Sequence, residues 1–225
     1  MRVVSIISVT IASILPALAG DVSGHVIITR RLSRRTVAPT VYNLRGTATP
    51  TGGPDDMEGS EFERTVVVLE GGKLRAPAPV TAEIEQRNTR FEPDLIVIPT
   101  GSTVKFPNFD PIFHNVFSLS SARPFDLGFY ARTQSRSVTF NRPGIVQIYC
   151  HIHSQMYAGI VVTSSPFSAK PAADGSFSFR DVPAGHYRLV AWHKIAGLHH
   201  VDIDVPEAGV RDAQIRVPVD VEQKP

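Results

Sequence analysis

The chain has 225 residues, of which 42% are hydrophobic, and this is enough for one sizeable core or two small ones. Its formal net charge of +2, with no basic stripe, excludes nucleic acid as the main partner. Eighteen prolines, sixteen glycines and many short runs rich in valine and isoleucine favour an all-β protein.

The first residues have the pattern of a secretory signal. A positive Arg2 precedes a mostly apolar stretch that ends near Leu15, and the sequence ALA at 17–19 supplies a small-residue cleavage site. We therefore expect residues 1–19 to be a signal peptide and the mature protein to be periplasmic or secreted. An uncleaved anchor is the alternative, but the apolar run is short for a span. No stable membrane insertion is expected once the signal is removed.

Residues 20–80 contain two predicted strands and a long polar loop. The strands are predicted by an alternating stretch at 22–30 and an apolar run at 65–72. Residues 31–62 are rich in Gly, Pro, Thr and acidic residues, which indicates a loop. Four arginines near the start of this loop are interpreted as a solvated charge run: Arg30, Arg31, Arg34 and Arg35.

Residues 81–164 carry short predicted strands with turn signals between them, which is typical of a sandwich or a barrel. The stretch 122–130 is interpreted as a loop, and no amphipathic helix is predicted. The predicted strands are 94–101, 102–108, 113–119, 135–140, 144–150 and 156–164.

Residues 165–225 predict further strands. The stretch "DGSFSFRDVPAGHYRL" at 174–189 resembles the carboxypeptidase regulatory-like, or transthyretin-like, β-sandwich, and Trp192 is expected to pack inside it. The opening strands of such a domain resemble Gly24-His25-Val26 and Val67-Val68-Leu69. The resemblance implies one sandwich whose chain is interrupted by residues 81–164. The alternative is that the N-terminal strands belong to the middle domain.

The single cysteine, Cys150, lies in the stretch "YCHIHSQM". Exported proteins usually pair their cysteines, so this thiol is an inert buried group, half of an intermolecular disulfide, or a metal ligand. Cys150, His153 and Met156 form a C-x2-H-x2-M pattern, and His114 lies upstream. Two imidazoles, a thiolate and a weak thioether suit both oxidation states of copper. Zinc also accepts cysteine and histidine but seldom recruits methionine.

Two segments, "GSTVKFPNFDPIFHNVFS" and "RPGIVQIYCHIHSQMYAGIVV", resemble the ligand-bearing segments of cupredoxins of the plastocyanin/amicyanin type. The resemblance implies a cupredoxin Greek-key β-sandwich at 81–164, inserted in or next to the small regulatory-like (transthyretin/Ig-like) β-sandwich. It implies that Asn115 ties the two ligand loops together. The combination is similar to bacterial exported proteins of the methylamine-utilisation-like kind. The implied ligands of one type 1 copper are His114, Cys150, His153 and Met156.

Three histidines leave alternatives open. His151 stands between the thiol and the second histidine ligand and is either an extra ligand or a surface residue. His199 and His200 are neighbours on a predicted strand, so their side chains point to opposite faces of the sheet and cannot bind one metal together. They are interpreted as surface residues. Ser154 stands where amicyanin-like loops commonly have proline.

The resemblance implies a one-electron carrier with an unidentified redox partner protein. The electron would leave at His153, and an apolar patch would receive the partner. A non-redox copper-holding or interaction module of the cell envelope is the alternative. An enzyme is not expected, since no hydrolase motif is present. A copper enzyme such as an oxidase or nitrite reductase is the last-ranked option, because it needs further histidine-rich sites and only the stretch HIH at 151–153 resembles them. The predicted patch comprises Pro111, Ile112, Phe113, Tyr157 and Ala158.

Overall fold

The computed structural model describes residues 19–29, 60–72 and 74–218. These residues form strands and turns without any helix, so the predicted all-β class is confirmed. Within these ranges, no helix is long and apolar enough to cross a membrane. The predicted signal peptide (apart from Ala19), the arginine cluster and most of the predicted loop 31–62 lie outside the described residues.

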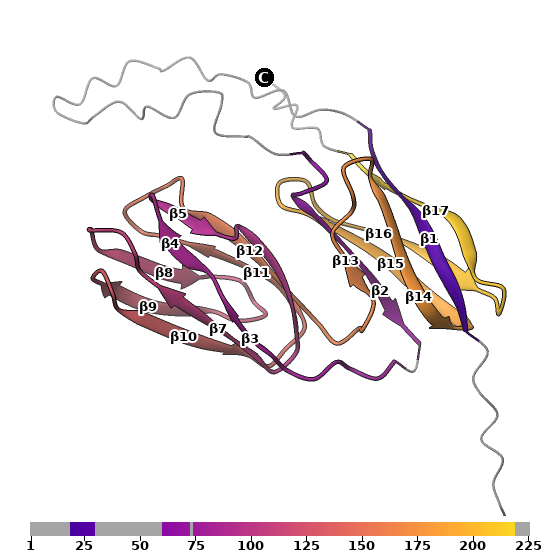
Figure 1. Cartoon of the computed structure of the whole chain (residues 1–225), viewed down its shortest axis with the longest axis horizontal. Helices are drawn as coiled ribbons and strands as arrows, with labels where there is room; N and C mark the ends of the chain where they lie inside the picture. Colours follow the sequence, from indigo (N-terminus) through magenta and orange to yellow (C-terminus); the bar gives the residue numbers. More distant parts are fainter. Residues whose placement is uncertain (1–18, 30–59, 73, 219–225) are drawn as a thin grey trace, which may run out of the picture.

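The strands form two β-sandwiches that lie next to each other along the long axis of the molecule (Figure 1). We call the one built from both ends of the chain the terminal sandwich. Its two sheets have the strand orders β14-β1-β17 and β13-β2-β15-β16. Its strands are β1 (Ala19–Ile28), β2 (Thr65–Gly71), β13 (Ser168–Ala169), β14 (Ser176–Pro183), β15 (Gly185–His193), β16 (Gly197–Val205) and β17 (Val210–Val217).

The other sandwich, which we call the middle sandwich, contains the strands between β2 and β13. Its sheets have the orders β10-β7-β3 and β6-β12-β11-β8-β9, and the hairpin β4-β5 lies beside them. Its strands are β3 (Thr81–Glu83), β4 (Glu85–Arg87), β5 (Arg90–Glu92), β6 (Leu95–Pro99), β7 (Ser102–Pro107), β8 (His114–Ser118), β9 (Phe125–Tyr130), β10 (Ser135–Phe140), β11 (Gly144–Tyr149) and β12 (Tyr157–Thr163).

The first two strands pair with strands from the other end of the chain. β1 pairs antiparallel with β14 and parallel with β17, and β2 pairs antiparallel with β15 and β13. The chain therefore leaves the terminal sandwich after β2 and returns to it at β13. In β1 every second residue is buried between Gly20 and Val26, which is the period-2 pattern of a strand with one face on a core.

A third apolar cluster joins the two sandwiches. It contains Trp192 of β15, Val66 of β2, and Leu95 and Val161 of the middle sandwich. The expectation that Trp192 packs inside the terminal sandwich is therefore wrong, because its side chain lies between the two. A Cβ atom at Gly159 would lie 2.3 Å from the Trp192 ring, so only glycine fits beneath the indole.

The interpretation of residues 122–130 as a loop is wrong, because Phe125–Tyr130 form β9. β9 is the edge strand of its sheet and pairs with β8 alone, with a register shift opposite Asn115 and Phe117. Gly128 has a φ of 63°, which interrupts the regular alternation that sequence reasoning looks for.

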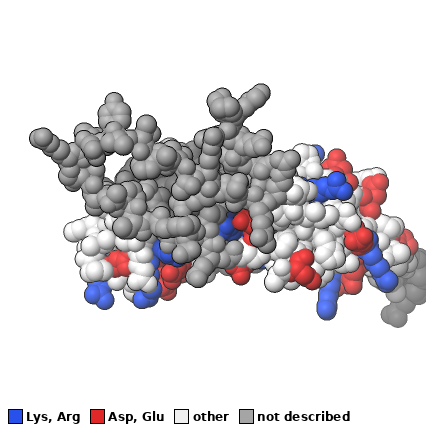
Figure 2. Space-filling model, turned by 90° about the horizontal axis from the view of Figure 1, so that it is seen from above, with Lys and Arg blue, Asp and Glu red and all other residues white. Residues whose placement is uncertain are grey.

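The charged residues of the described part are mixed in sign over the face that Figure 2 presents, with Lys and Arg next to Asp and Glu. Exposed ion pairs among the described residues include Arg188 with Asp202 and Arg87 with Glu85. Exposed pairs of this kind contribute little to stability, so the two apolar cores and the cluster between them hold the fold.

Candidate metal centre

The chain segment 150–156 joins β11 to β12, and we call it the ligand loop. Cys150 and Met156, at its two ends, are buried in the core of the middle sandwich, whereas His153 at its centre is half-buried. The Met156 backbone N–H donates to the His153 carbonyl at 3.0 Å, which closes the loop into a turn. His114, the first residue of β8, is fully buried.

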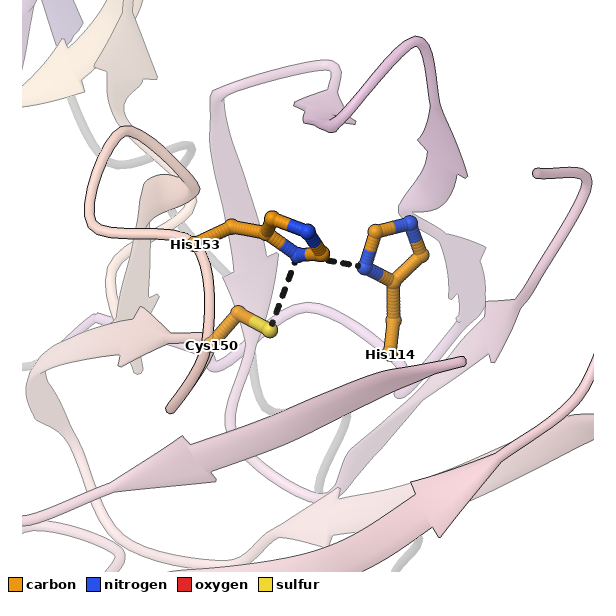
Figure 3. Close-up of side chains that lie close together, drawn as sticks. All are labelled: His114, Cys150 and His153. Carbon is orange, nitrogen blue, oxygen red and sulfur yellow. Dashed lines mark hydrogen bonds between the residues drawn. The ribbon is translucent and has the colours of Figure 1, made fainter. Parts of the chain in front are cut away.

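Three predicted ligands converge at one end of the middle sandwich (Figure 3). The Nδ1 atoms of His114 and His153 lie 3.0 Å apart, and the Cys150 Sγ atom lies 3.7 Å from the His153 Nδ1 atom. All three ligand atoms lie within 4.8 Å of one another. Within the described ranges, this is the one group of three or more His, Cys, Asp or Glu side chains that could hold a metal ion.

Met156 has no exposed surface and belongs to the same buried cluster as Cys150. The assignment of its sulfur as an axial ligand stays a prediction. The soft thiol and the two imidazoles nevertheless form a donor set that suits copper in either oxidation state, and also zinc.

His153 is suited to be a ligand because its imidazole stays neutral. Burial and the neighbouring His114 ring lower the pKa of His153, and the nearby Asp110 carboxylate opposes them. A metal binds the unprotonated nitrogen of imidazole, so a lowered pKa extends binding to lower pH.

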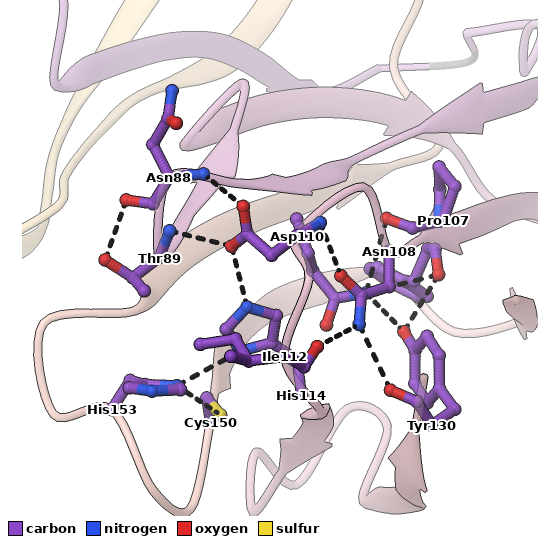
Figure 4. A network of polar contacts seen from close by, with 12 residues as sticks. Asn88, Thr89, Pro107, Asn108, Asp110, Ile112, His114, Tyr130, Cys150 and His153 are labelled. Atoms are coloured by element: carbon purple, nitrogen blue, oxygen red, sulfur yellow. Dashed lines mark hydrogen bonds and ion pairs between the residues drawn. The ribbon is translucent and has the colours of Figure 1, made fainter. Parts of the chain in front are cut away.

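The buried carboxylate of Asp110, which sequence reasoning missed, contacts the His114 ring (Figure 4). The His114 Nε2 atom lies 2.7 Å from Asp110 Oδ2, on the ring edge opposite the converging Nδ1 atoms. An Nε2–H that donates to this carboxylate leaves the Nδ1 lone pair toward Cys150 and fixes the tautomer that a metal requires.

Asp110 is itself held by the turn between β4 and β5. The Asn88 and Thr89 backbone N–H groups donate to its two oxygens at 2.7 and 2.8 Å. Burial raises the pKa of Asp110, but the hydrogen bonds from the turn and from the imidazole outweigh burial and hold this pKa below its ordinary value. The carboxylate therefore stays ionised near neutral pH. Both turn residues have φ near +54°, a conformation that asparagine tolerates and threonine rarely adopts.

Asn108 fixes the connection between β7 and β8. Its side chain accepts a hydrogen bond from the Asp110 backbone N–H at 2.9 Å. It also donates to the backbone carbonyls of Ile112 and Tyr130 at 2.9 and 3.1 Å. Asp110 and His114 are thus presented from a segment that the Asn108 side chain ties to itself and to Tyr130 of β9, as Figure 4 shows.

Asn115 contacts the start of the ligand loop. Its side-chain oxygen accepts from the His151 backbone N–H at 3.3 Å, and its amide nitrogen donates to Asp126 of β9 at 2.6 Å. The side chain therefore lies between the strand that carries His114 and the loop that carries Cys150. Its role as a positioning residue of the metal stays a prediction.

His151 lies apart from the converging atoms. It is exposed, its ring stacks on Phe117 with centroids 3.9 Å apart, and its Nε2 atom lies 3.3 Å from Asp126 Oδ2. The group of converging ligand atoms does not include it. This placement favours the surface interpretation of the third imidazole.

The predicted apolar patch is present only in part. Pro111, Ile112 and Phe113 are exposed, with Phe113 at 60%, but Ala158 is buried and Tyr157 is half-buried against Lys194. Ala158 therefore does not belong to the patch. Further exposed apolar side chains in the middle sandwich, which sequence reasoning missed, include Phe109, Phe129 and Ile152.

Comparison with known proteins gives matches that each cover less than half of the chain. A family model described as the β-sandwich domain of ER membrane protein complex subunit 7 matches residues 151–224. A search of curated proteins finds no match.

Among solved structures, a copper-containing nitrite reductase from Thermus scotoductus is similar at 28% identity, with a TM-score of 0.35. The match covers 44% of this chain and 25% of the reductase, so this chain spans a quarter of its length. A reduced Cu(I) amicyanin mutant has 21% identity over 39% of this chain and 85% of its own, with a TM-score of 0.34. A purple cupredoxin from Nitrosopumilus maritimus has 21% identity over 36% of this chain and 99% of its own, with a TM-score of 0.34.

Proposed function

We propose that the protein binds one type 1 copper ion through His114, Cys150, His153 and Met156 and serves as an exported one-electron carrier. The observation that supports this most is the convergence of an unpaired buried thiol with two imidazole Nδ1 atoms. When bound, copper would supply reversible exchange between its two oxidation states, which sulfur and nitrogen ligands both accommodate.

The residues around the site favour electron transfer over simple metal storage because they resist rearrangement. Asp110 holds the His114 ring, and its own oxygens are held by the backbone of the β4-β5 turn. Cys150 and Met156 are packed in a β-sandwich core. Ligands that keep their positions when the charge of the metal changes lower the reorganisation that electron transfer requires.

The half-buried His153 is the proposed point where electrons enter and leave. It follows the exposed Ile152 on the ligand loop and contacts His114, which directly follows the exposed Ile112 and Phe113 in the sequence. An apolar surface with few charges suits a short-lived complex with a redox partner protein, because it buries area without fixing long side chains. The predicted signal peptide at residues 1–19 supports a location for this exchange in the periplasm or outside the cell.

An interaction module that holds copper without cycling it is the second candidate. The match of residues 151–224 to a β-sandwich domain of a multi-subunit complex favours an assembly role for the terminal sandwich. Redox behaviour separates the two, since a carrier must be oxidised and reduced repeatedly without losing its metal.

The test is to add Cu(II) to the purified protein and record absorption and electron paramagnetic resonance spectra through cycles of ascorbate and ferricyanide. We expect an intense visible thiolate-to-copper band that disappears and returns with each cycle. Cys150→Ser should remove the band, and equimolar zinc should not displace the copper. A wild-type protein without the band, or a serine variant that keeps it, would refute the proposal.

Met156→Leu tests the axial ligand separately. It preserves volume, so the fold should be unchanged. We expect the visible band to remain and the reduction potential to rise, because a weak sulfur donor to the metal is lost. An unchanged potential would remove Met156 from the ligand set.

A further inference from the structure

The terminal sandwich contacts the middle sandwich at the point where the ligand loop ends. Tyr157 directly follows Met156, and its hydroxyl donates to the Lys194 backbone carbonyl at 2.9 Å. Lys194 lies in the turn between β15 and β16, and its Nζ atom lies 4.7 Å from the centroid of the Tyr157 ring. Two independent contacts therefore fix one tyrosine to the other sandwich.

The turn that carries Lys194 is rigid. The Nδ1 atom of the buried His193 accepts hydrogen bonds from the Ile195 and Ala196 backbone N–H groups at 3.2 and 3.0 Å. The Lys194 backbone N–H donates to the Arg64 carbonyl at 2.9 Å. Tyr157 thus bonds to a fixed carbonyl, and a fixed partner can restrain it.

The start of β12 is held at a second point. Trp192 packs directly on Gly159, and the Gly159 backbone N–H donates to the Asp94 carbonyl at 2.9 Å. The Asp94 carboxylate in turn pairs with the Lys194 ammonium. The first residues of β12 cannot shift without moving the contact between the sandwiches.

Tyr157 also contacts β11, the strand that leads into Cys150. Its ring stacks on Tyr149, the residue before Cys150, with centroids 5.2 Å apart, and Gln147 donates to its hydroxyl at 2.9 Å. Tyr149 and Tyr157 are direct partners in the β11-β12 ladder, so they form the base of the ligand loop. A restraint on Tyr157 is therefore applied to both ends of the loop that holds Cys150 and Met156.

We infer that the terminal sandwich is a positioning element of the metal centre and acts through Tyr157, which the Lys194 carbonyl holds at the base of the ligand loop. The inference rests on the proposed copper site. Tyr157 itself is a positioning residue, since its hydroxyl bonds to Gln147 and Lys194 rather than to the converging ligands. The terminal sandwich would then set the properties of the copper without supplying a ligand.

The experiment compares Tyr157→Phe with a matched control, Tyr187→Phe. The Tyr187 hydroxyl donates to the Pro183 carbonyl at 2.8 Å within the terminal sandwich, at the opposite end of β15 from His193. Each variant keeps its ring and loses one hydroxyl that donates to a backbone carbonyl, so Tyr187→Phe controls for the loss of such a bond away from the ligand loop.

For the copper-loaded proteins, the readouts are the copper hyperfine splitting, the ratio of the visible bands, the reduction potential and the rate of copper release to a chelator. We expect Tyr157→Phe to change both spectra and the potential and to release copper about fivefold faster, and Tyr187→Phe to match the wild type. Equal spectra, potentials and release rates in all three proteins would overturn the inference.

Hydrogen exchange of the metal-free proteins separates this inference from the copper proposal. We expect the amides of residues 150–156 to exchange faster in Tyr157→Phe than in the wild type or Tyr187→Phe. If the wild type fails to bind copper, the proposed function is wrong, and this exchange difference still decides whether Tyr157 restrains the loop. Identical loop exchange in the three proteins would show that it does not.

Discussion

The middle and terminal sandwiches each bury a histidine against a carboxylate. In the middle sandwich the His114 Nε2 atom lies 2.7 Å from Asp110, and in the terminal sandwich the His193 Nε2 atom lies 2.9 Å from Glu61. Both imidazoles are fully buried. The two pairs have the same chemistry, so the pair alone does not distinguish a ligand from a structural residue.

The difference lies in what the Nδ1 atom contacts. The Nδ1 atom of His193 accepts two backbone hydrogen bonds from its own turn. The Nδ1 atom of His114 instead points at His153 and the thiol of Cys150. A buried histidine is available to a metal when the fold satisfies one ring nitrogen and leaves the other facing further donors.

The largest effect expected from this comparison is on metal affinity. We predict that His114→Ala weakens copper binding by more than about 100-fold, because a ligand is lost and not merely a supporting residue. His193→Ala should keep the affinity within about tenfold but lower the free energy of unfolding by about 2–4 kcal/mol, since backbone donors and Glu61 lose their partner. Copper titration measures the affinities, and thermal unfolding measures the stabilities. The comparison would be contradicted if His193→Ala lost copper affinity and His114→Ala kept it.

Asp110 and Glu61 should differ in their effect on copper affinity in the same way as the two histidines. We predict that Asp110→Asn lowers copper affinity about tenfold, because an amide nitrogen meets the turn N–H donors and the ring is no longer oriented. Glu61→Gln is the matched change in the terminal sandwich and should leave affinity nearly unaltered. Copper titrations of both variants measure this, and equal losses would show that the Asp110 contact has no special role.

Acid should act on the terminal sandwich through His193. Burial lowers the pKa of His193, although the Glu61 carboxylate opposes the shift. Below the ordinary value of about 6.5, the unfolded chain binds a proton that the folded protein binds more weakly. The free energy of unfolding should therefore fall as the pH drops from about 7 to 5.

Chemical denaturation across this pH range measures the slope. His193→Asn should flatten the slope relative to the wild type, because the proton uptake of the unfolded chain at this position is gone. The same slope in both proteins would mean that His193 does not titrate differently in the folded state.

The smallest effect is predicted for His151. His151→Asn should leave the visible and paramagnetic spectra of the copper protein nearly unchanged, because the ring stacks on Phe117 and faces Asp126. A large spectral change would make this imidazole a ligand in place of His153.

The all-β class was predictable because period-2 alternation and turn residues are local signals. The spacing of Cys150, His153 and Met156 was likewise local, since one short loop between adjacent strands carries all three. The prediction that His114 approaches this loop depended on the resemblance to cupredoxins, because no property of residues 113–119 alone indicates which strand they pair with.

The missed residues are those whose role depends on contacts distant in sequence. Asp110 resembles any loop acid until the Asn88-Thr89 turn is seen to donate to it. That turn was itself missed, because a threonine with positive φ is not a usual turn signal. Trp192 alternates correctly for a strand, but which of two cores it enters depends on the contact with Gly159.

The pairing of β1 with β17 affects the order in which the molecule can assemble. Val26 pairs with Ile215, so the sheet of the terminal sandwich needs two strands that lie far apart in the sequence before it is complete. All strands of the middle sandwich lie between Thr81 and Thr163 and can pair earlier, with smaller loop-closure entropy. The middle sandwich, which carries the proposed copper ligands, can therefore fold before the terminal sandwich is complete.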